Sequence, residues 1–111
     1  MDAKETIEKL NAGAEELSTQ MPEQMKNFQK FADSVISDGV LSSKVKVLVT
    51  IGVSVAKRCK PCIVMNLKKA IDLGVTKEEI LEACSAVMLL DGGPAVAYTT
   101  FLAEKYDELV S

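Results

Sequence analysis

The sequence predicts an all-α fold: a bundle of six helices in a single domain over residues 1–111. Apolar residues recur every three or four positions through most of the chain, which is the spacing of amphipathic helices. Glycine, proline and capping residues separate these runs by short connections. We find no internal repeat, linker or low-complexity segment.

Two amphipathic helices are expected at the start of the chain. The first covers about residues 3–18, and Met21-Pro22 ends it. Pro22 suits the first turn of the second helix, which ends near Gly39, a residue able to adopt a left-handed C-terminal cap. The apolar face of the first helix consists of Ile7, Leu10, Ala14 and Leu17, and that of the second of Met25, Phe28, Ala32, Val35 and Ile36.

Residues 43–58 fit two structures. β-Branched residues alternate there, which favours a strand; they are Val45, Val47, Val49, Ile51, Val53 and Val55. Nothing else in the chain offers a strand partner, however, and a lone strand would leave its backbone groups unpaired. We therefore predict a buried helix, capped by Ser42 or Ser43.

Three further helices complete the bundle. One follows Cys62 and closes at Gly74. The next opens at Thr76-Lys77-Glu78-Glu79, which has the capping-box pattern. Asp91-Gly92-Gly93-Pro94 interrupts the chain, and Pro94 is suited to begin a last helix that continues through Leu109.

The composition restricts the classes of partner. Apolar residues make up 48% of the chain but aromatic residues only 5%, and so much aliphatic surface in a small domain favours a homo-oligomer. The net charge of −3 does not favour nucleic acid as a partner. Neither a signal peptide nor a run long enough to cross a bilayer is evident, so we expect a cytoplasmic protein without a membrane partner.

Cys59 and Cys62 form the most informative motif. Two residues separate them at the predicted start of a helix, so both sulfurs lie on one face of a turn, close enough for a disulfide. The helix N-terminus and the neighbouring Lys57, Arg58 and Lys60 favour the thiolate over the thiol. In a reducing compartment such a pair is more typical of catalysis or metal binding than of a permanent cross-link. By position, we expect Cys59 to be the more exposed of the two.

Two simpler interpretations of this motif remain open. The thiols could be inert small hydrophobic groups. A zinc or iron–sulfur site needs about four ligands, and because the chain has no histidine, such a site would have to be shared between subunits. Cys84 lies on the apolar stripe of its helix, which predicts a buried, non-catalytic thiol rather than a third redox partner. We predict no cofactor and no bound metal.

Several segments, in a fixed order, resemble the carboxymuconolactone decarboxylase family. They are Lys46-Val47-Leu48-Val49, the run from Ala56 to Cys62, the run from Leu73 to Ile80, and Gly92-Gly93-Pro94-Ala95. The alkylhydroperoxidase D-like branch, which keeps the two cysteines, is the most similar, and the resemblance covers roughly residues 40–105. It implies an all-helical fold that assembles as trimers or hexamers.

The resemblance also shows what this sequence lacks. In the peroxidase branch, a glutamate twelve residues before the first cysteine and a histidine four residues after the second relay protons from the thiols. Val47 and Asn66 occupy these positions here, so only the dithiol carries over. Asn66 could hydrogen-bond the sulfur of Cys62, but an amide cannot accept its proton. Loss of a positioned base costs about 10²–10⁴ in rate.

We therefore predict a thiol–disulfide oxidoreductase that cycles Cys59 and Cys62 between dithiol and disulfide. It would reduce a protein or small-molecule disulfide using an unidentified electron donor, with at most weak peroxidase or antioxidant activity. One alternative is a non-catalytic oligomeric binding protein of the same fold. Another is a carboxymuconolactone decarboxylase-type enzyme, which would need polar groups for a dicarboxylate lactone; Arg58 is the only arginine.

Overall fold

The computed structural model describes residues 1–111 as six α-helices without a strand, which confirms the predicted fold class. The helices are α1 (Ala3–Gln20), α2 (Pro22–Ile36), α3 (Ser43–Ala56), α4 (Lys60–Asp72), α5 (Lys77–Asp91) and α6 (Gly93–Val110). None of them combines the length and the apolar character that crossing a membrane would require.

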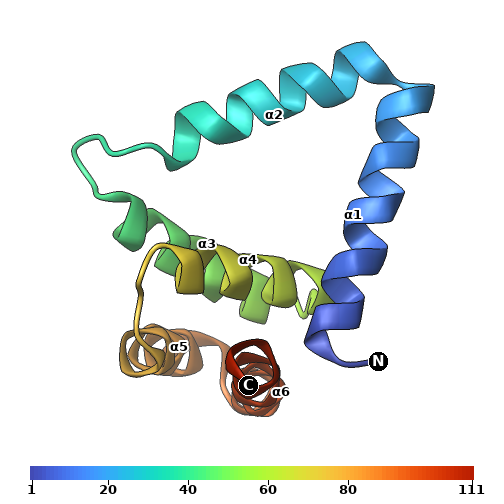
Figure 1. The fold of residues 1–111 in the computed structure, drawn as a ribbon. Coiled ribbons are helices and arrows are strands. Elements are labelled where there is room, and N and C mark those ends of the chain that lie inside the picture. The colour runs from blue at the N-terminus through green and yellow to red at the C-terminus, as the bar shows by residue number, and fades with distance from the viewer.

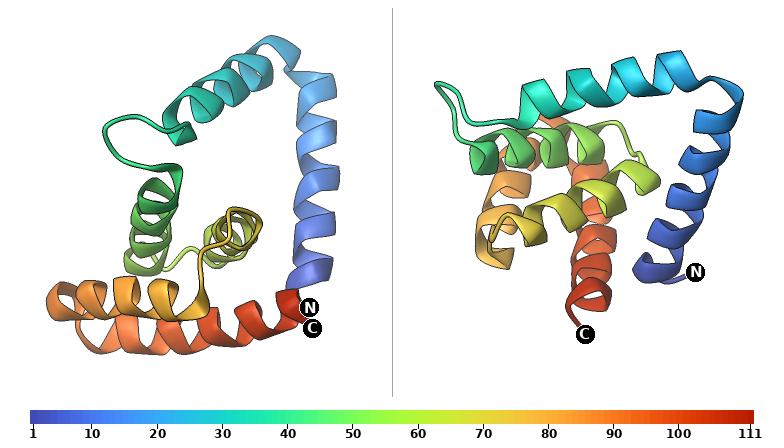
Figure 2. Two further views of the ribbon diagram at one scale, coloured as in Figure 1. Left: turned by 60° about the vertical axis from the view of Figure 1, so that its left-hand side comes forward. Right: turned by 45° about the horizontal axis from the view of Figure 1, so that its top comes forward.

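Helices α3 to α6 pack together around the core, as Figure 2 shows from two sides. The alternating β-branched residues form a helix, α3, and its periodicity sorts them into two faces. Val47, Ile51 and Val55, spaced by four, are fully buried. The remaining core residues are Ile63, Leu67, Ala70, Val75, Ile80, Cys84, Ala95 and Leu102. The valines between them on α3 face outward.

Helices α1 and α2 form two sides of an open frame that stands away from this core (Figure 1). No residue of α2 is buried, and Ala3 is the only buried residue of α1. The predicted apolar faces therefore exist but are left half-covered or exposed. We call α1 and α2 together the α1–α2 arm. A short amphipathic helix draws most of its stability from tertiary packing, so this arm needs further contacts.

Both ends of the arm are attached to the core. The backbone N–H of Ala3 donates to Glu108 Oε1 at 2.7 Å, next to the end of α6. At the other end, Lys46 Nζ donates to the carbonyl oxygens of Val35 (2.8 Å) and Ser37 (2.7 Å). This ammonium takes the place of the expected cap at Gly39, which is not left-handed and lies beyond the end of α2. That prediction was wrong.

The other predicted helix boundaries agree with the structure. Ser42 caps α3 by accepting the N–H of Val45 at 3.2 Å. Thr76 and Glu79 form both hydrogen bonds of the capping box, and this pairing holds the pKa of Glu79 below its ordinary value. Gly74 has a left-handed φ of 81° directly after α4. These residues fix the start of α3, the end of α4 and the start of α5.

Candidate redox site

The turn between α3 and α4 places the cysteine pair. The N–H of Arg58 donates to the carbonyl oxygen of Val55, and the N–H of Cys59 to that of Ser54, both at 3.0 Å. These two bonds are the Schellman pattern, in which glycine usually takes the left-handed position. Here Arg58 takes it, with φ 56°. Helix α3 thus ends in a fixed geometry directly before Cys59.

Cys59 also begins the next helix, since it is the N-cap residue of α4. Its Sγ accepts the backbone N–H of Cys62 at 3.3 Å. The two cysteines are joined as a disulfide, with their Cα atoms 5.2 Å apart. Pro61, which has no N–H, lies in the first turn, where no intrahelical donor is needed.

The exposure of the two cysteines is the reverse of the expected order. Cys62 is exposed, whereas Cys59 is half-buried. The reason is the dual position of Cys59: its backbone closes one helix, and its side chain turns back over the first turn of the next. A reagent from solution therefore has better access to Cys62.

The three basic residues around the pair have different surroundings. Arg58 Nη2 lies 3.4 Å from both carboxylate oxygens of Asp91 at the end of α5. The ammonium of Lys60 lies over the ring of Phe101 in α6, 5.1 Å from its centroid. Lys57 is exposed. Because Asp91 offsets the charge of Arg58, the net positive potential at the turn comes mainly from Lys57 and Lys60.

Asn66 lies one turn beyond Cys62 and contacts its backbone. Asn66 Nδ2 donates to the carbonyl oxygen of Cys62 at 2.8 Å and to Ser54 Oγ at 3.2 Å. The buried hydroxyl of Ser54 donates in turn to the carbonyl oxygen of Thr50 at 2.7 Å. The hydrogen bond to the Cys62 sulfur that the sequence suggested is not formed. Sequence reasoning missed Ser54, although it follows Val47 by two helical turns on the buried face of α3.

The position of Val47 is part of the core, since its side chain is fully buried. Cys84 is also fully buried, as predicted, and burial raises the pKa of its thiol. The nearby hydroxyl of Thr99 offsets part of this rise in the pKa of Cys84. Val47 and Cys84 thus belong to the hydrophobic core.

An open groove of about 620 Å³ runs between α1 and the cysteine turn. Pro61, which lies between the two cysteines in the sequence, is its lining residue from the cysteine turn. The other lining residues are Met1, Thr6, Lys9, Leu10, Gly13, Ala14 and Leu17.

Comparisons with known proteins agree with this architecture. A model of the carboxymuconolactone decarboxylase family matches residues 22–105, which extends the resemblance through α2. The structure is similar to the crystal structure of an apo carboxymuconolactone decarboxylase family protein from Legionella pneumophila, with a TM-score of 0.93 and 28% identity over 98% of this chain and 97% of that one.

Two curated relatives, both named as uncharacterized proteins, match most of the chain. One, from Cupriavidus necator, is 26% identical over 108 residues, covering 97% of this chain and 96% of the relative. The other, from Methanocaldococcus jannaschii, is 37% identical over 78 residues, covering 68% and 74%.

Proposed function

The chain belongs to the carboxymuconolactone decarboxylase family, and we propose that it acts there as a thiol–disulfide oxidoreductase of the alkylhydroperoxidase D-like type. The observation that carries this proposal is the disulfide between Cys59 and Cys62, formed within the first turn of α4 with Cys62 exposed to solvent. A vicinal pair in this position can open and close without rearranging the core.

The exposed cysteine begins the reaction. In the reduced protein, the Cys62 thiolate attacks one sulfur of a substrate disulfide and forms a mixed disulfide, and the other substrate sulfur leaves as a thiolate that takes a proton from water. Cys59 then attacks the Cys62 sulfur and releases the second substrate thiol. The substrate has gained two electrons, and the protein holds the Cys59–Cys62 disulfide.

A donor dithiol closes the cycle. Its thiolate attacks the accessible Cys62 sulfur, and Cys59 leaves as a thiolate at the N-terminus of α4. There the backbone N–H of Cys62 and the positive end of the helix stabilise it. The donor's second thiol resolves the mixed disulfide, so the donor becomes a disulfide. A cytoplasmic location, which we also propose, would supply such dithiols.

A protein disulfide suits this site as substrate. The groove along α1 includes Pro61, the residue directly before Cys62 in the sequence, and part of its lining is apolar. An extended segment could lie there while its disulfide meets the exposed sulfur. Exchange of this kind needs no dedicated proton relay, because the start of α4 and the neighbouring lysines favour the thiolate form of the pair.

Efficient peroxide turnover has less support. Val47 lies in the core, and the Asn66 amide donates to a carbonyl oxygen and a hydroxyl. Neither side chain can take a proton from a thiol or deliver one to a leaving hydroxide. We therefore propose disulfide reduction as the main activity.

Reduction of insulin by the pre-reduced protein, with a dithiol as electron donor, tests the proposal. We expect activity in the parent and in Cys84→Ser, and its loss in Cys59→Ser and in Cys62→Ser. Cys59→Ser should accumulate a mixed disulfide on Cys62, visible by mass spectrometry, because the resolving thiol is missing. Cys62→Ser should react more slowly with an aromatic reporter disulfide, since its remaining thiol is half-buried.

Parent-like activity in both single serine variants would sink the proposal. An inactive parent whose thiols resist alkylation would favour the non-catalytic binding protein instead. If Cys62→Ser rather than Cys59→Ser traps the substrate, the exchange stands but the order of the two cysteines is reversed.

A further inference from the structure

Basic and acidic residues are segregated along the chain. Residues 39–71 contain seven of the thirteen basic residues and none of the sixteen acidic ones. The disulfide between Cys59 and Cys62 lies within this basic segment, where α3 gives way to α4. The net charge of −3 therefore does not describe the surroundings of the redox pair, which lies in the basic part of an acidic chain.

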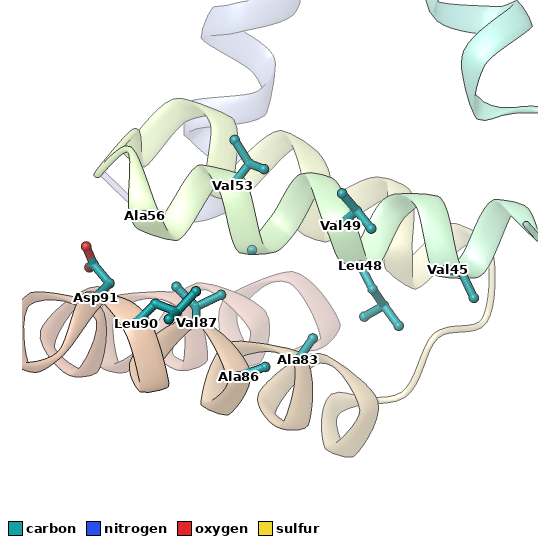
Figure 3. Close-up of a pocket in the computed structure, with 11 residues that line it drawn as sticks. Val45, Leu48, Val49, Val53, Ala56, Ala83, Ala86, Val87, Leu90 and Asp91 are labelled. Carbon is teal, nitrogen blue, oxygen red and sulfur yellow. The ribbon is translucent and has the colours of Figure 1, made fainter.

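The basic residues next to the disulfide differ in whether their charge is compensated. In Figure 3 the carboxylate of Asp91 turns from the end of α5 toward the end of α3, at Ala56. There it pairs with Arg58. Lys57 and Lys60 are exposed, and neither of them forms an ion pair. The charges of these two lysines are thus available to a partner.

The ring of Phe101 holds one of the two ammonium groups in place. The Nζ of Lys60 lies 5.1 Å from the ring centroid. An aromatic ring attracts a cation but carries no net charge, so the positive charge of Lys60 is positioned without being cancelled. Lys105 lies over the same ring at 5.3 Å, but it is paired with Glu108 at 3.1 Å. Lys57 and Lys60 therefore remain as two uncompensated positive charges at the cysteine turn.

The groove along α1 has the same sign of charge. Lys9 is the only charged side chain in its lining, and none of the four glutamates of α1 lines it. Pro61, which follows Lys60 and precedes Cys62, belongs to the same lining. A chain segment in this groove would therefore meet apolar surface and positive charge, but no carboxylate of the lining.

We propose that the disulfide substrate is a protein segment with acidic residues beside its cysteines. The inference rests on the proposed thiol–disulfide exchange and names the substrate class of that site; the transfer of electrons is unchanged. Acidic residues next to a disulfide normally repel an attacking thiolate, and Lys57 and Lys60 would offset that repulsion. The same lysines would attract an acidic segment during encounter and repel a basic one, which gives selectivity between substrates.

The test compares three disulfide peptides of equal length and ring size, which carry glutamate, glutamine or lysine beside their cysteines. Each kcat/KM is divided by the rate constant with which dithiothreitol reduces the same peptide, because this removes the peptide's intrinsic reactivity. The glutamate peptide should be preferred over the lysine peptide by at least about tenfold at low ionic strength, with glutamine between them. At about 1 M salt, where charges are screened beyond about 3 Å, the preference should fall to within about twofold.

Charge variants locate the preference on the molecule. Lys57→Glu should reduce it to about threefold or less, because the charge then introduced cancels that of Lys60. Lys57→Arg keeps the charge and should keep the preference. Lys30→Glu is the matched control: it changes the net charge equally, but on the exposed surface of α2, one side of the open frame in Figure 1. The preference is a ratio within one protein, so a change in the thiolate fraction cancels from it.

Several outcomes overturn the inference. Equal normalised rates for the three peptides, or a faster rate with the lysine peptide, would do so while leaving the exchange itself intact. A preference that survives Lys57→Glu or high salt, or that is lost equally in Lys30→Glu, would show that the charges at the cysteine turn do not select the substrate. If none of the peptides is reduced, the proposed exchange fails and the inference fails with it.

Discussion

The sulfur of Cys59 accepts the backbone N–H of Cys62 across the first turn of α4, at 3.3 Å. This hydrogen bond joins the two halves of the redox pair through the backbone as well as through the disulfide. In the proposed exchange, the same N–H would stabilise a thiolate that forms on Cys59 at the start of α4. Cys62, by contrast, is exposed to solvent.

Replacing Lys60 by methionine should weaken this stabilisation. One positive charge at the start of α4 is lost, and the attraction between exposed opposite charges is worth a few tenths to about 1 kcal/mol. The midpoint of the pH dependence of thiol alkylation in the reduced protein should rise by about 0.2–0.7 pH unit. Lys68→Met, near the other end of α4 where Lys68 pairs with Asp72, is the control and should not shift it. Equal midpoints for all three proteins would contradict the electrostatic argument.

Arg58 should be less favourable in its turn than glycine. A left-handed φ costs a residue with a side chain about 1–2 kcal/mol, whereas the exposed pair with Asp91 is worth at most about 1 kcal/mol. Arg58→Gly should therefore be more stable than Arg58→Ala by about 1 kcal/mol. Urea unfolding checks this. Since both variants lose the ion pair, identical stabilities would mean that the turn relaxes.

Restoring the two relay groups should have opposite effects on stability and activity. Val47 is fully buried, so Val47→Glu alone should destabilise the fold by several kcal/mol, because a carboxylate loses its hydration there. Asn66 is half-buried, so Asn66→His should be tolerated. Combining the two should raise peroxide turnover in a coupled peroxidase assay. An unchanged rate in a folded double variant would mean that the relay alone does not explain the difference from peroxidases.

Acid should loosen the attachment of α1. The hydrogen bond from Lys105 and the N–H of Ala3 hold the pKa of Glu108 below its ordinary value. The resulting stability is complete above the unfolded pKa of about 4.3 and is lost as the pH falls through the lower folded value. Glu108→Gln should melt below the parent at neutral pH, and the two melting temperatures should converge in acid. A gap that stays constant with pH would contradict this role of the carboxylate.

Local signals predicted most of the helices. The capping box at Thr76 and the glycine at position 74 act within one turn, so their effect can be read from neighbouring residues. The helix at residues 43–56 required a global argument, because its valines favour a strand and only the absence of a partner strand decides against it. The cap at Gly39 failed because Lys46, from the next helix, binds the last carbonyls of α2 instead.

The site was predictable in its residues but not in its contacts. The motif identified Cys59 and Cys62, yet their exposure depends on the Schellman turn before them. That turn places Arg58 in a left-handed conformation, which a sequence signals only when the residue is glycine. The pairing of Arg58 with Asp91 joins residues 33 positions apart. Such contacts follow from the packing of α3 against α5, and no spacing in the sequence encodes them.

The last backbone bond of α3 and the N-cap of α4 meet in a single residue, Cys59. No flexible loop residue therefore separates the two helices. Inserting one residue here would rotate α4 by about 100° about its axis and carry Cys62 and Asn66 around to different neighbours. The connection between α2 and α3, at residues 37–42, is a loop of six residues, so a change in its length need not rotate either helix. Variation in length should thus be accepted at that loop and rejected at the cysteine turn.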